Sequence, residues 1–135
     1  MKFRIVTPDG VIYEDDIEKV SIPTTTGDIM VLENHVPLLS LLKAGEMVIY
    51  KADHTVSLAI SQGMLEVHHD HTVSVLADTA ERAEHIDISR AEEARKRAEA
   101  LLTEQEHVAD VDFARLQAKM EKELARISVG KKYRG

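Results

Sequence analysis

The densest group of potential metal ligands in the sequence is the run His68-His69-Asp70-His71. Imidazole nitrogens are common ligands of zinc, and a neighbouring carboxylate can orient a liganding ring. His69 and His71 would share one face of a strand, because side chains alternate along a strand with a period of two. A tight turn, however, rarely directs three ligands at one point. We therefore interpret this run as a solvated hairpin turn and predict no metal site.

No pairing of a nucleophile with a base stands out elsewhere in the chain. The absence of cysteine excludes disulfides, thiolate nucleophiles and cysteine-ligated zinc. The G-x-S-x-G, P-loop, G-x-G-x-x-G and H-E-x-x-H motifs are also missing. We interpret the adjacent acids Asp15-Asp16 and Glu92-Glu93 as solvated charge. The sequence therefore predicts no catalytic residues and a binding or regulatory protein, not an enzyme.

Composition sets the class of protein that these residues belong to. A chain of 135 residues with 44% hydrophobic content can form one domain, or a small domain with an appendage. The net charge of −7 argues against nucleic-acid binding, which usually needs a basic surface. No stretch approaches the roughly 20 apolar residues of a membrane-spanning helix, and the first residues hold no signal-peptide core. We expect a soluble, cytoplasmic protein that meets a membrane only through a partner.

The charge is unevenly distributed along the chain. Most of the negative charge lies in residues 1–86, whereas residues 87–135 carry slightly more cations than anions. A difference in charge between two halves indicates a difference in their tasks.

The first part of the chain, from Phe3 to Ala77, alternates apolar and polar residues with the period of a strand, as at Val20 and Ile22. Turn residues interrupt this pattern at short intervals. In Thr7-Pro8-Asp9-Gly10, for example, proline sets the φ angle for a type I turn. We count eight or nine candidate strands. Many short strands with frequent turns predict an antiparallel β-sandwich or a small barrel.

The pattern then changes to that of a helix. From Asp87 to about Glu106 the chain is rich in Ala, Glu, Arg and Leu, which are good helix formers. Ser89 and Glu92 have the spacing of a capping box, and Asp87 is an alternative N-cap. Both alternatives place the start of a helix just after the last predicted strand.

A second helix follows a break at residues 107–112. We expect it to run to about Ser128, with Gly130 as a stop signal. The two helices predict an antiparallel hairpin. The fold class is therefore α+β, with a β-sandwich domain over residues 1–84 and a helical hairpin domain over residues 85–135.

Each predicted helix carries an apolar stripe that would pack against the other. The stripes consist of Ile88, Ala91, Ala94, Ala98 and Leu101 on the first helix, and of Phe113, Leu116, Met120, Leu124 and Ile127 on the second. Because alanine buries little apolar area, such a seam is weaker than one built from leucine. Two interpretations stay open. The hairpin is either stable and closely packed, or marginally docked and able to dock elsewhere.

Several short segments, in order over essentially the whole chain, carry a resemblance to a known family. They are Val6-Thr7-Pro8-Asp9-Gly10 with Tyr13-Glu14, Asn34-His35-Val36-Pro37-Leu38-Leu39, Ser61-Gln62-Gly63-Met64-Leu65-Glu66-Val67, Val75-Leu76-Ala77-Asp78-Thr79-Ala80-Glu81, and Ile86-Asp87-x-x-Arg90-Ala91. This series resembles the epsilon subunits of bacterial rotary ATP synthases. Gln62 departs from the series, since the family commonly has glycine there.

The resemblance implies a role for each half. The sandwich is expected to bind the foot of the gamma subunit and to rest on the c-ring, in the central stalk of a proton-translocating ATP synthase. Asp28 and His35 are expected in the loop region that the family turns toward the ring. Such a subunit lies peripherally at the cytoplasmic face of the cell membrane.

The hairpin is implied to be a switch. Folded on the sandwich, it leaves the enzyme active; extended along gamma into the alpha/beta hexamer, it blocks ATP hydrolysis. Cations of the second helix are expected to meet an acidic segment of the beta subunit, and the candidates are Lys119, Lys122, Arg126, Lys131 and Lys132. The alternative is that these charges only solvate a helix and a tail.

The segment from residue 81 to residue 91 is most similar to epsilon subunits of bacilli, in which the folded hairpin binds ATP. The ATP-binding residues that this resemblance implies are Glu81, Ile86, Asp87, Arg90, Ala91, Arg97 and Arg126. A guanidinium can hold phosphate oxygens with two hydrogen bonds. Lys122 stands where those relatives tend to have arginine. ATP would then be a regulatory ligand and not a catalytic cofactor.

Two alternatives to the ATP-gated switch remain open. Asp87 and Arg90 could instead form a helix cap and a surface ion pair. The whole chain could also be a free-standing nucleotide-sensing module.

Overall fold

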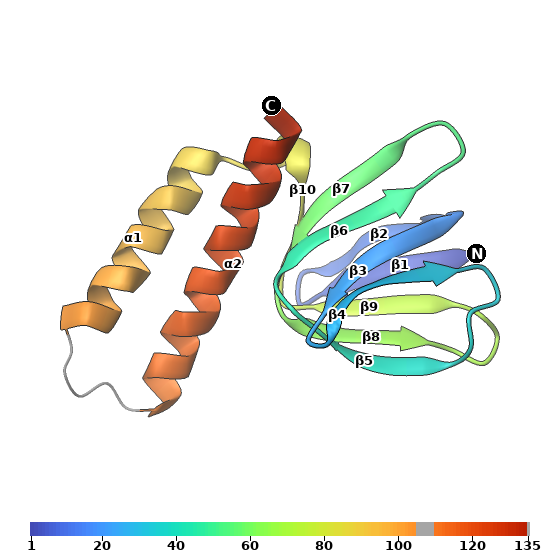
Figure 1. Ribbon diagram of the computed structural model, residues 1–135, viewed down its shortest axis with the longest axis horizontal. Coiled ribbons are helices and arrows are strands. Elements are labelled where there is room, and N and C mark those ends of the chain that lie inside the picture. The colour runs from blue at the N-terminus through green and yellow to red at the C-terminus, as the bar shows by residue number, and fades with distance from the viewer. Residues whose placement is uncertain (105–109, 135) are drawn as a thin grey trace.

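The computed structural model describes residues 1–104 and 110–134, which form a β-structure followed by two helices (Figure 1). The strands are β1 (Lys2–Thr7), β2 (Gly10–Asp16), β3 (Lys19–Thr24), β4 (Gly27–Leu32), β5 (Leu38–Leu42), β6 (Gly45–Tyr50), β7 (Thr55–Ile60), β8 (Gly63–Val67), β9 (Val73–Ala77) and β10 (Ala80–Arg82). A 3-10 turn, η1 (Ala83–His85), leads to α1 (Ile88–Glu104) and α2 (Asp110–Arg134). The predicted α+β fold, a β-sandwich followed by two helices, is confirmed.

The strands form one continuous sheet that folds into the sandwich. Their order is β10-β7-β6-β3-β5-β8-β9-β1-β2, and β4 pairs with β3. The expectation of a purely antiparallel sandwich is wrong at one place, since β1 and β9 pair in parallel, with Phe3 opposite Val73. The hairpin with β2 fixes one edge of β1 but leaves the direction of a neighbour at its other edge undetermined.

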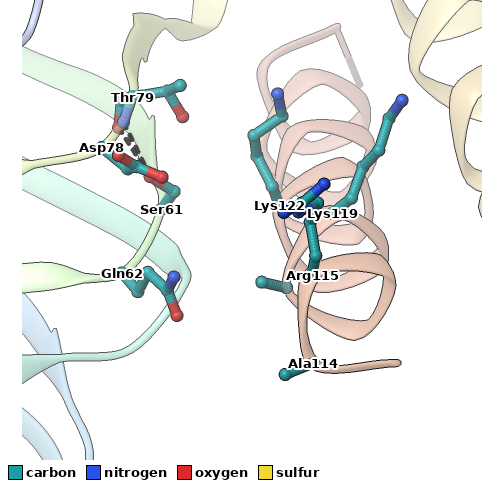
Figure 2. A pocket seen from close by; sticks show the side chains of 9 residues that line it. Ser61, Gln62, Asp78, Thr79, Ala114, Arg115, Lys119 and Lys122 are labelled. Atoms are coloured by element: carbon teal, nitrogen blue, oxygen red, sulfur yellow. Dashed lines mark hydrogen bonds between the residues drawn. The ribbon is translucent and has the colours of Figure 1, made fainter. Parts of the chain in front are cut away.

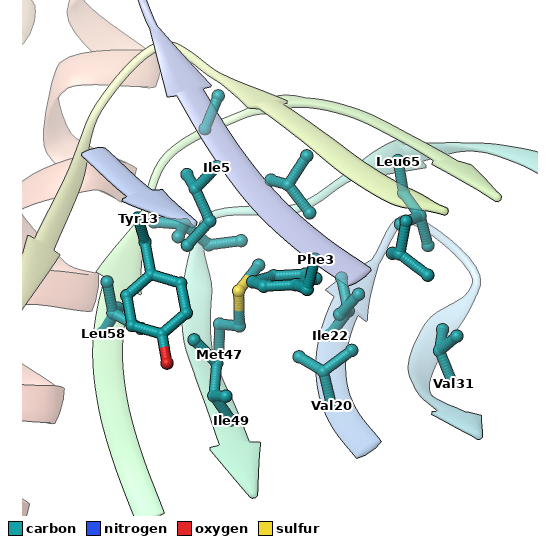
Figure 3. Close-up of a cluster of buried hydrophobic side chains, with 14 of the residues drawn as sticks. Phe3, Ile5, Tyr13, Val20, Ile22, Val31, Met47, Ile49, Leu58 and Leu65 are labelled. Carbon is teal, nitrogen blue, oxygen red and sulfur yellow. The ribbon is translucent and has the colours of Figure 1, made fainter. Parts of the chain in front are cut away.

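The core of the sandwich follows directly from the alternation in the sequence. Phe3 and Ile5 on β1 are buried, and so are Met47 on β6, Leu58 on β7 and Leu65 on β8. Figure 3 shows these side chains converging between the two faces of the folded sheet. Because this cluster contains none of the helix residues whose burial the structure describes, the sandwich has its own core and presents its outer surface to the hairpin.

Helix α2 lies between α1 and the sandwich (Figure 1). It contacts α1 on one side and β6, β7 and η1 on the other. Asp87 caps α1, because its Oδ1 accepts a hydrogen bond from the Arg90 backbone N–H at 3.1 Å. The break that the sequence predicts at residues 107–112 lies partly outside the described residues. Within the described part of the chain, neither helix is long and apolar enough to cross a membrane.

The predicted stripe is right for most of α1 and wrong for part of α2. Ala91, Ala94 and Ala98 are buried as expected. On α2, Phe113 and Leu124 are 51% and 47% exposed. The stripe was predicted on the assumption that α2 packs only against α1. Because α2 also packs against the sandwich, the prediction does not give the residues that the helix buries. Between residues 112 and 134, the residues that it buries are instead Glu123, Ala125, Val129 and Gly130.

Gly130 does not end the second helix, which continues to Arg134. A Cβ at Gly130 would lie 2.9 Å from Cγ1 of Ile88 and 3.1 Å from Cγ2 of Ile86. The glycine thus lets α2 approach the start of α1 closely. The prediction that Gly130 ends the helix is wrong because glycine is favoured both at helix ends and where two helices pack closely.

We predict that Gly130→Ala loosens the hairpin. Alanine favours a helix over glycine by about 1 kcal/mol, but overpacking typically costs about 1–3 kcal/mol. Since Ile86 is fully buried, we expect the clash to outweigh the helix propensity. Amide hydrogen exchange in residues 120–134 should become faster. The control is Ser128→Ala, an exposed position on the same helix. Slower exchange in Gly130→Ala would contradict this account.

Candidate functional site

The residues implied to bind ATP lie where the sandwich joins the hairpin. Glu81 is on β10, Ile86 and Asp87 precede α1, and Arg90 and Ala91 form its first turn. Arg97 follows two turns later on α1, and Arg126 lies on α2. The chain reverses between α1 and α2, and this reversal brings Arg126 back to the sandwich.

Arg126 is the centre of this junction. Its Nε lies 2.7 Å from Oε2 of Glu81, and its second terminal nitrogen lies 3.4 Å from Oε1 of the same carboxylate. Its first terminal nitrogen donates to Oε2 of Glu123 at 2.8 Å. The side chain of Glu123 is only 3% exposed. One guanidinium therefore pairs with two carboxylates, one from the sandwich side and one from its own helix, and the Lys122 ammonium lies 3.6 Å from Oε1 of Glu123 as a second cation.

The protonation state of Arg126 follows from this geometry. Partial burial disfavours the charged form, but the hydrogen bonds to Glu81 and Glu123 outweigh it and raise the pKa of Arg126 above its ordinary value. The group therefore stays charged over the whole physiological range. A ligand phosphate that reached Arg126 would have to compete with both carboxylates.

The apolar members of the implied set have structural positions in this state. Ile86 is fully buried in a small cluster with Ala59, Ala83 and Val129. The carbonyl of Ile86 accepts a hydrogen bond from Arg134 at 2.7 Å. Ala91 is fully buried as well, on the stripe that packs the helices together.

The remaining cations of the set face solvent. Arg90 and Arg97 are both exposed on α1. Residues seven apart lie nearly on the same face of a helix, so the two guanidinium groups can approach one anion together. The structure thus brings Glu81 and Arg126 into direct contact. It places Asp87 and Arg90 together at the start of α1, and leaves Arg97 further along that helix.

The basic run of α2 is largely paired within the molecule. Lys131 lies 3.4 Å from Glu92 of α1, and Lys132 lies 2.8 Å from Glu46 of β6. The hydrogen bond to Glu46 raises the pKa of Lys132. The cations could be predicted from the sequence, but their carboxylate partners could not. No local pattern links Glu46 to a residue 86 positions away.

A second candidate surface is an apolar row on the outer face of the sandwich. Leu41, Met64 and Leu76 lie opposite one another on β5, β8 and β9 and are 58%, 36% and 46% exposed. Val6 on β1 and Val11 on β2 continue the row across the next two strands. Neighbouring exposed apolar residues of this kind mark a contact surface.

Two expectations about the loops have different outcomes. His68-His69-Asp70-His71 lies in the connection between β8 and β9, where Asp70 accepts a hydrogen bond from the Thr72 N–H at 3.0 Å. The interpretation as a hairpin turn is confirmed.

Asp28 and His35 do not share a loop. Asp28 is paired at the start of β4 because Gly27, with φ 121°, completes the preceding turn, and His35 follows the other end of β4.

The chain matches two family models over nearly its whole length. Residues 1–83 match the beta-sandwich domain of the ATP synthase delta/epsilon chain, and residues 84–131 match its long alpha-helix domain. The ATP synthase epsilon chain of Bacillus cytotoxicus is 41% identical over 125 residues, which cover 93% of this chain and 92% of that protein. The epsilon chain of Bacillus subtilis is 44% identical over 111 residues, covering 82% and 83%.

Two solved structures share the fold. A chain of the mitochondrial ATP synthase of Euglena gracilis (OSCP/F1/c-ring) matches with a TM-score of 0.74 at 18% identity, over 91% of this chain and 76% of that chain. A chain of the central stalk and c-ring of the Tetrahymena thermophila enzyme matches with a TM-score of 0.70 at 12% identity, over 96% of each. At these identities the likeness concerns the fold alone. Both domains and the Bacillus relatives together show that the chain belongs to the delta/epsilon family of ATP synthase chains, as an epsilon-type chain.

Proposed function

We propose that this chain is a rotor subunit of the central stalk in a proton-translocating ATP synthase, and that its hairpin is a mobile inhibitor of ATP hydrolysis. The observation that carries the proposal is the set of ion pairs that hold α2 in its folded position. Its cations Arg126, Lys131 and Lys132 are paired with carboxylates of the folded molecule. The subunit would itself be non-catalytic. It would reach the cytoplasmic face of the cell membrane only through the complex.

The sandwich is the docking part of the subunit. Its apolar row of Val6, Val11, Leu41, Met64 and Leu76 lies on the outside of strands whose inner faces form the core. Burial of such a row contributes about 25 cal/mol for each Å² removed from water. The proposed partners are the gamma subunit, which would cover this row, and the c-ring at the end of the sandwich.

We predict that Leu41→Glu with Leu76→Glu prevents association with gamma. Two charges within an apolar contact cannot be hydrated once it closes, so binding should weaken by at least about a hundredfold. Co-purification with gamma and the c-ring measures this effect. Leu124→Glu, the same change at an exposed leucine of α2, is the control. Unchanged co-purification of the double variant would show that gamma binds elsewhere.

One ion pair of α2 links the helix to the sandwich, between Lys132 and Glu46 of β6. In the proposed extended state Lys132 would lie away from Glu46, and its ammonium group would be available to an acidic segment of the beta subunit. Exposed ion pairs are weak because water screens them, so their exchange for intermolecular pairs costs little. An extended hairpin would thus exchange one set of carboxylates for another.

We predict that Lys131→Gln with Lys132→Gln relieves inhibition in the assembled ATP synthase. In the docked state the variant loses two weak pairs, whereas in the extended state it loses its contacts with acidic groups at the catalytic core. The rate of ATP hydrolysis should therefore rise severalfold toward that of a complex lacking the hairpin. Lys96→Gln, at an exposed position of α1, is the matched control. Equal or stronger inhibition in the double variant would contradict this role.

ATP is the proposed regulatory ligand of the docked state. Asp87 and Arg90 lie together at the start of α1, and Arg126 lies at the junction with β10. A ligand that binds only one state stabilises it by about 2.7 kcal/mol at a hundredfold excess over its Kd. That free energy is enough to shift a nearly balanced equilibrium of the hairpin.

We predict that the isolated chain binds ATP and that Arg90→Ala abolishes this binding. The exposed guanidinium of Arg90 would lose its charge-assisted hydrogen bonds to the ligand, whereas the cap formed by Asp87 uses the backbone and would persist. Calorimetric titration measures both proteins. Arg95→Ala, which removes an arginine paired with Glu99 on the same helix, is the control. No saturable binding into the millimolar range would leave a rotor subunit whose hairpin is not gated by nucleotide.

A further inference from the structure

A cleft separates the first half of α2 from the edge of the sandwich. Its volume is about 590 Å³, within the range of small-molecule sites. The sandwich side consists of the β7–β8 connection, Ser61 and Gln62, and of the β9–β10 connection, Asp78 and Thr79. Figure 2 shows these residues facing α2 across the gap. The cleft does not contain Glu81, Arg90 or Arg126.

The helix side of the cleft is strongly basic. Arg115, Lys119 and Lys122 line it from successive turns of α2, at spacings of four and three residues. Like charges at these spacings repel one another and destabilise a helix. Among the described residues that line the cleft, the one acid is Asp78 on the opposite wall. Lys122 also lies 3.6 Å from Glu123 of its own helix. Arg115 and Lys119 therefore provide the remaining positive charge of the cleft, opposite Asp78.

The opposite wall is held rigidly by its own hydrogen bonds. The Ser61 N–H donates to the Thr79 carbonyl at 3.0 Å, and the Thr79 N–H donates to Oγ of Ser61 at 2.7 Å. The Asp78 N–H donates to the Gln62 carbonyl at 3.0 Å. The exposed side chains of Gln62 and Thr79 add neutral hydrogen-bond donors to this wall. The cleft therefore has cations on its helix side and a hydrogen-bonded polar wall on its sandwich side.

We propose that this cleft binds a phosphate-class polyanion between α2 and the sandwich. The anion would neutralise Arg115 and Lys119 and accept hydrogen bonds from the opposite wall. Because it would contact both walls, its binding would favour the docked hairpin. The chemistry is shared by free phosphate or pyrophosphate and by the phosphate tail of a nucleotide. The site does not depend on Arg90 and stands whether or not that arginine binds ATP.

The test is a calorimetric titration of the full chain with pyrophosphate at low ionic strength, with chloride at matched ionic strength as the reference. We expect saturable binding that weakens about tenfold for each cation removed, in Arg115→Gln and in Arg115→Gln with Lys119→Gln. Both side chains are exposed, so the variants should keep the fold, and circular dichroism checks this. Lys96→Gln on α1 should bind as the wild type does.

A second readout separates a ligand that bridges the cleft from one that binds a surface lysine. Pyrophosphate should slow amide exchange in residues 112–126 of the wild-type chain and leave the double variant unchanged. Absence of saturable binding would overturn the proposal, and so would equal affinity of the double variant or an unchanged exchange rate in the wild type.

The source of the phosphate is decided by competition. If ATP displaces pyrophosphate from wild type, and the double variant also weakens ATP, then the nucleotide tail occupies the cleft. If ATP does not compete, the cleft is a site for free phosphate. Loss of ATP binding in Arg90→Ala with normal pyrophosphate binding would show that the two sites are separate.

Discussion

Arg126 connects the two parts of the molecule through carboxylates that would otherwise repel each other. Glu123 is nearly buried by the packing of α2, and a buried carboxylate without a partner is strongly destabilising. Glu81 needs the same guanidinium from the sandwich side. The same cation thus pairs with both carboxylates when the hairpin is docked, and Lys122 lies 3.6 Å from Glu123 as a second cation. In the proposed extended state all three groups would meet water, so the contact would open without leaving an unpaired buried charge.

Apolar contacts contribute only modestly to docking of the hairpin, compared with the ion pairs of Arg126. The cluster beneath the end of α2 consists of Ala59, Ala83, Ile86 and Val129, with Ile88 at its margin. Two of its members are alanines, which bury little area. The proposed movement of the hairpin would break only this small cluster and partly exposed ion pairs.

Alternation of apolar residues was enough to predict the sandwich, since each buried residue of β1 or β6 lies two positions from the next. Features that depend on contacts between segments distant in the sequence could not be predicted. The parallel pairing of β1 with β9 depends on how a long sheet folds onto itself. The exposure of Phe113 and Leu124 depends on a second partner of α2, and the helical Gly130 depends on the nearness of Ile86. Within the candidate site, the resemblance identified Glu81 and Arg126, but Glu46 and Glu123 needed the structure.

The parallel pair of β1 and β9 also bears on how the protein is made. Strand β1 leaves the ribosome early, but its second edge has no pairing partner until β9, with Val73 and Val75, has been synthesised. Contacts between residues so distant in sequence slow folding, and the edge of β1 stays open to other chains in the meantime. Nascent chains would therefore carry an unsatisfied edge for most of translation. A chaperone or an early assembly partner that shields the β1–β2 hairpin during synthesis would raise the yield of the folded subunit.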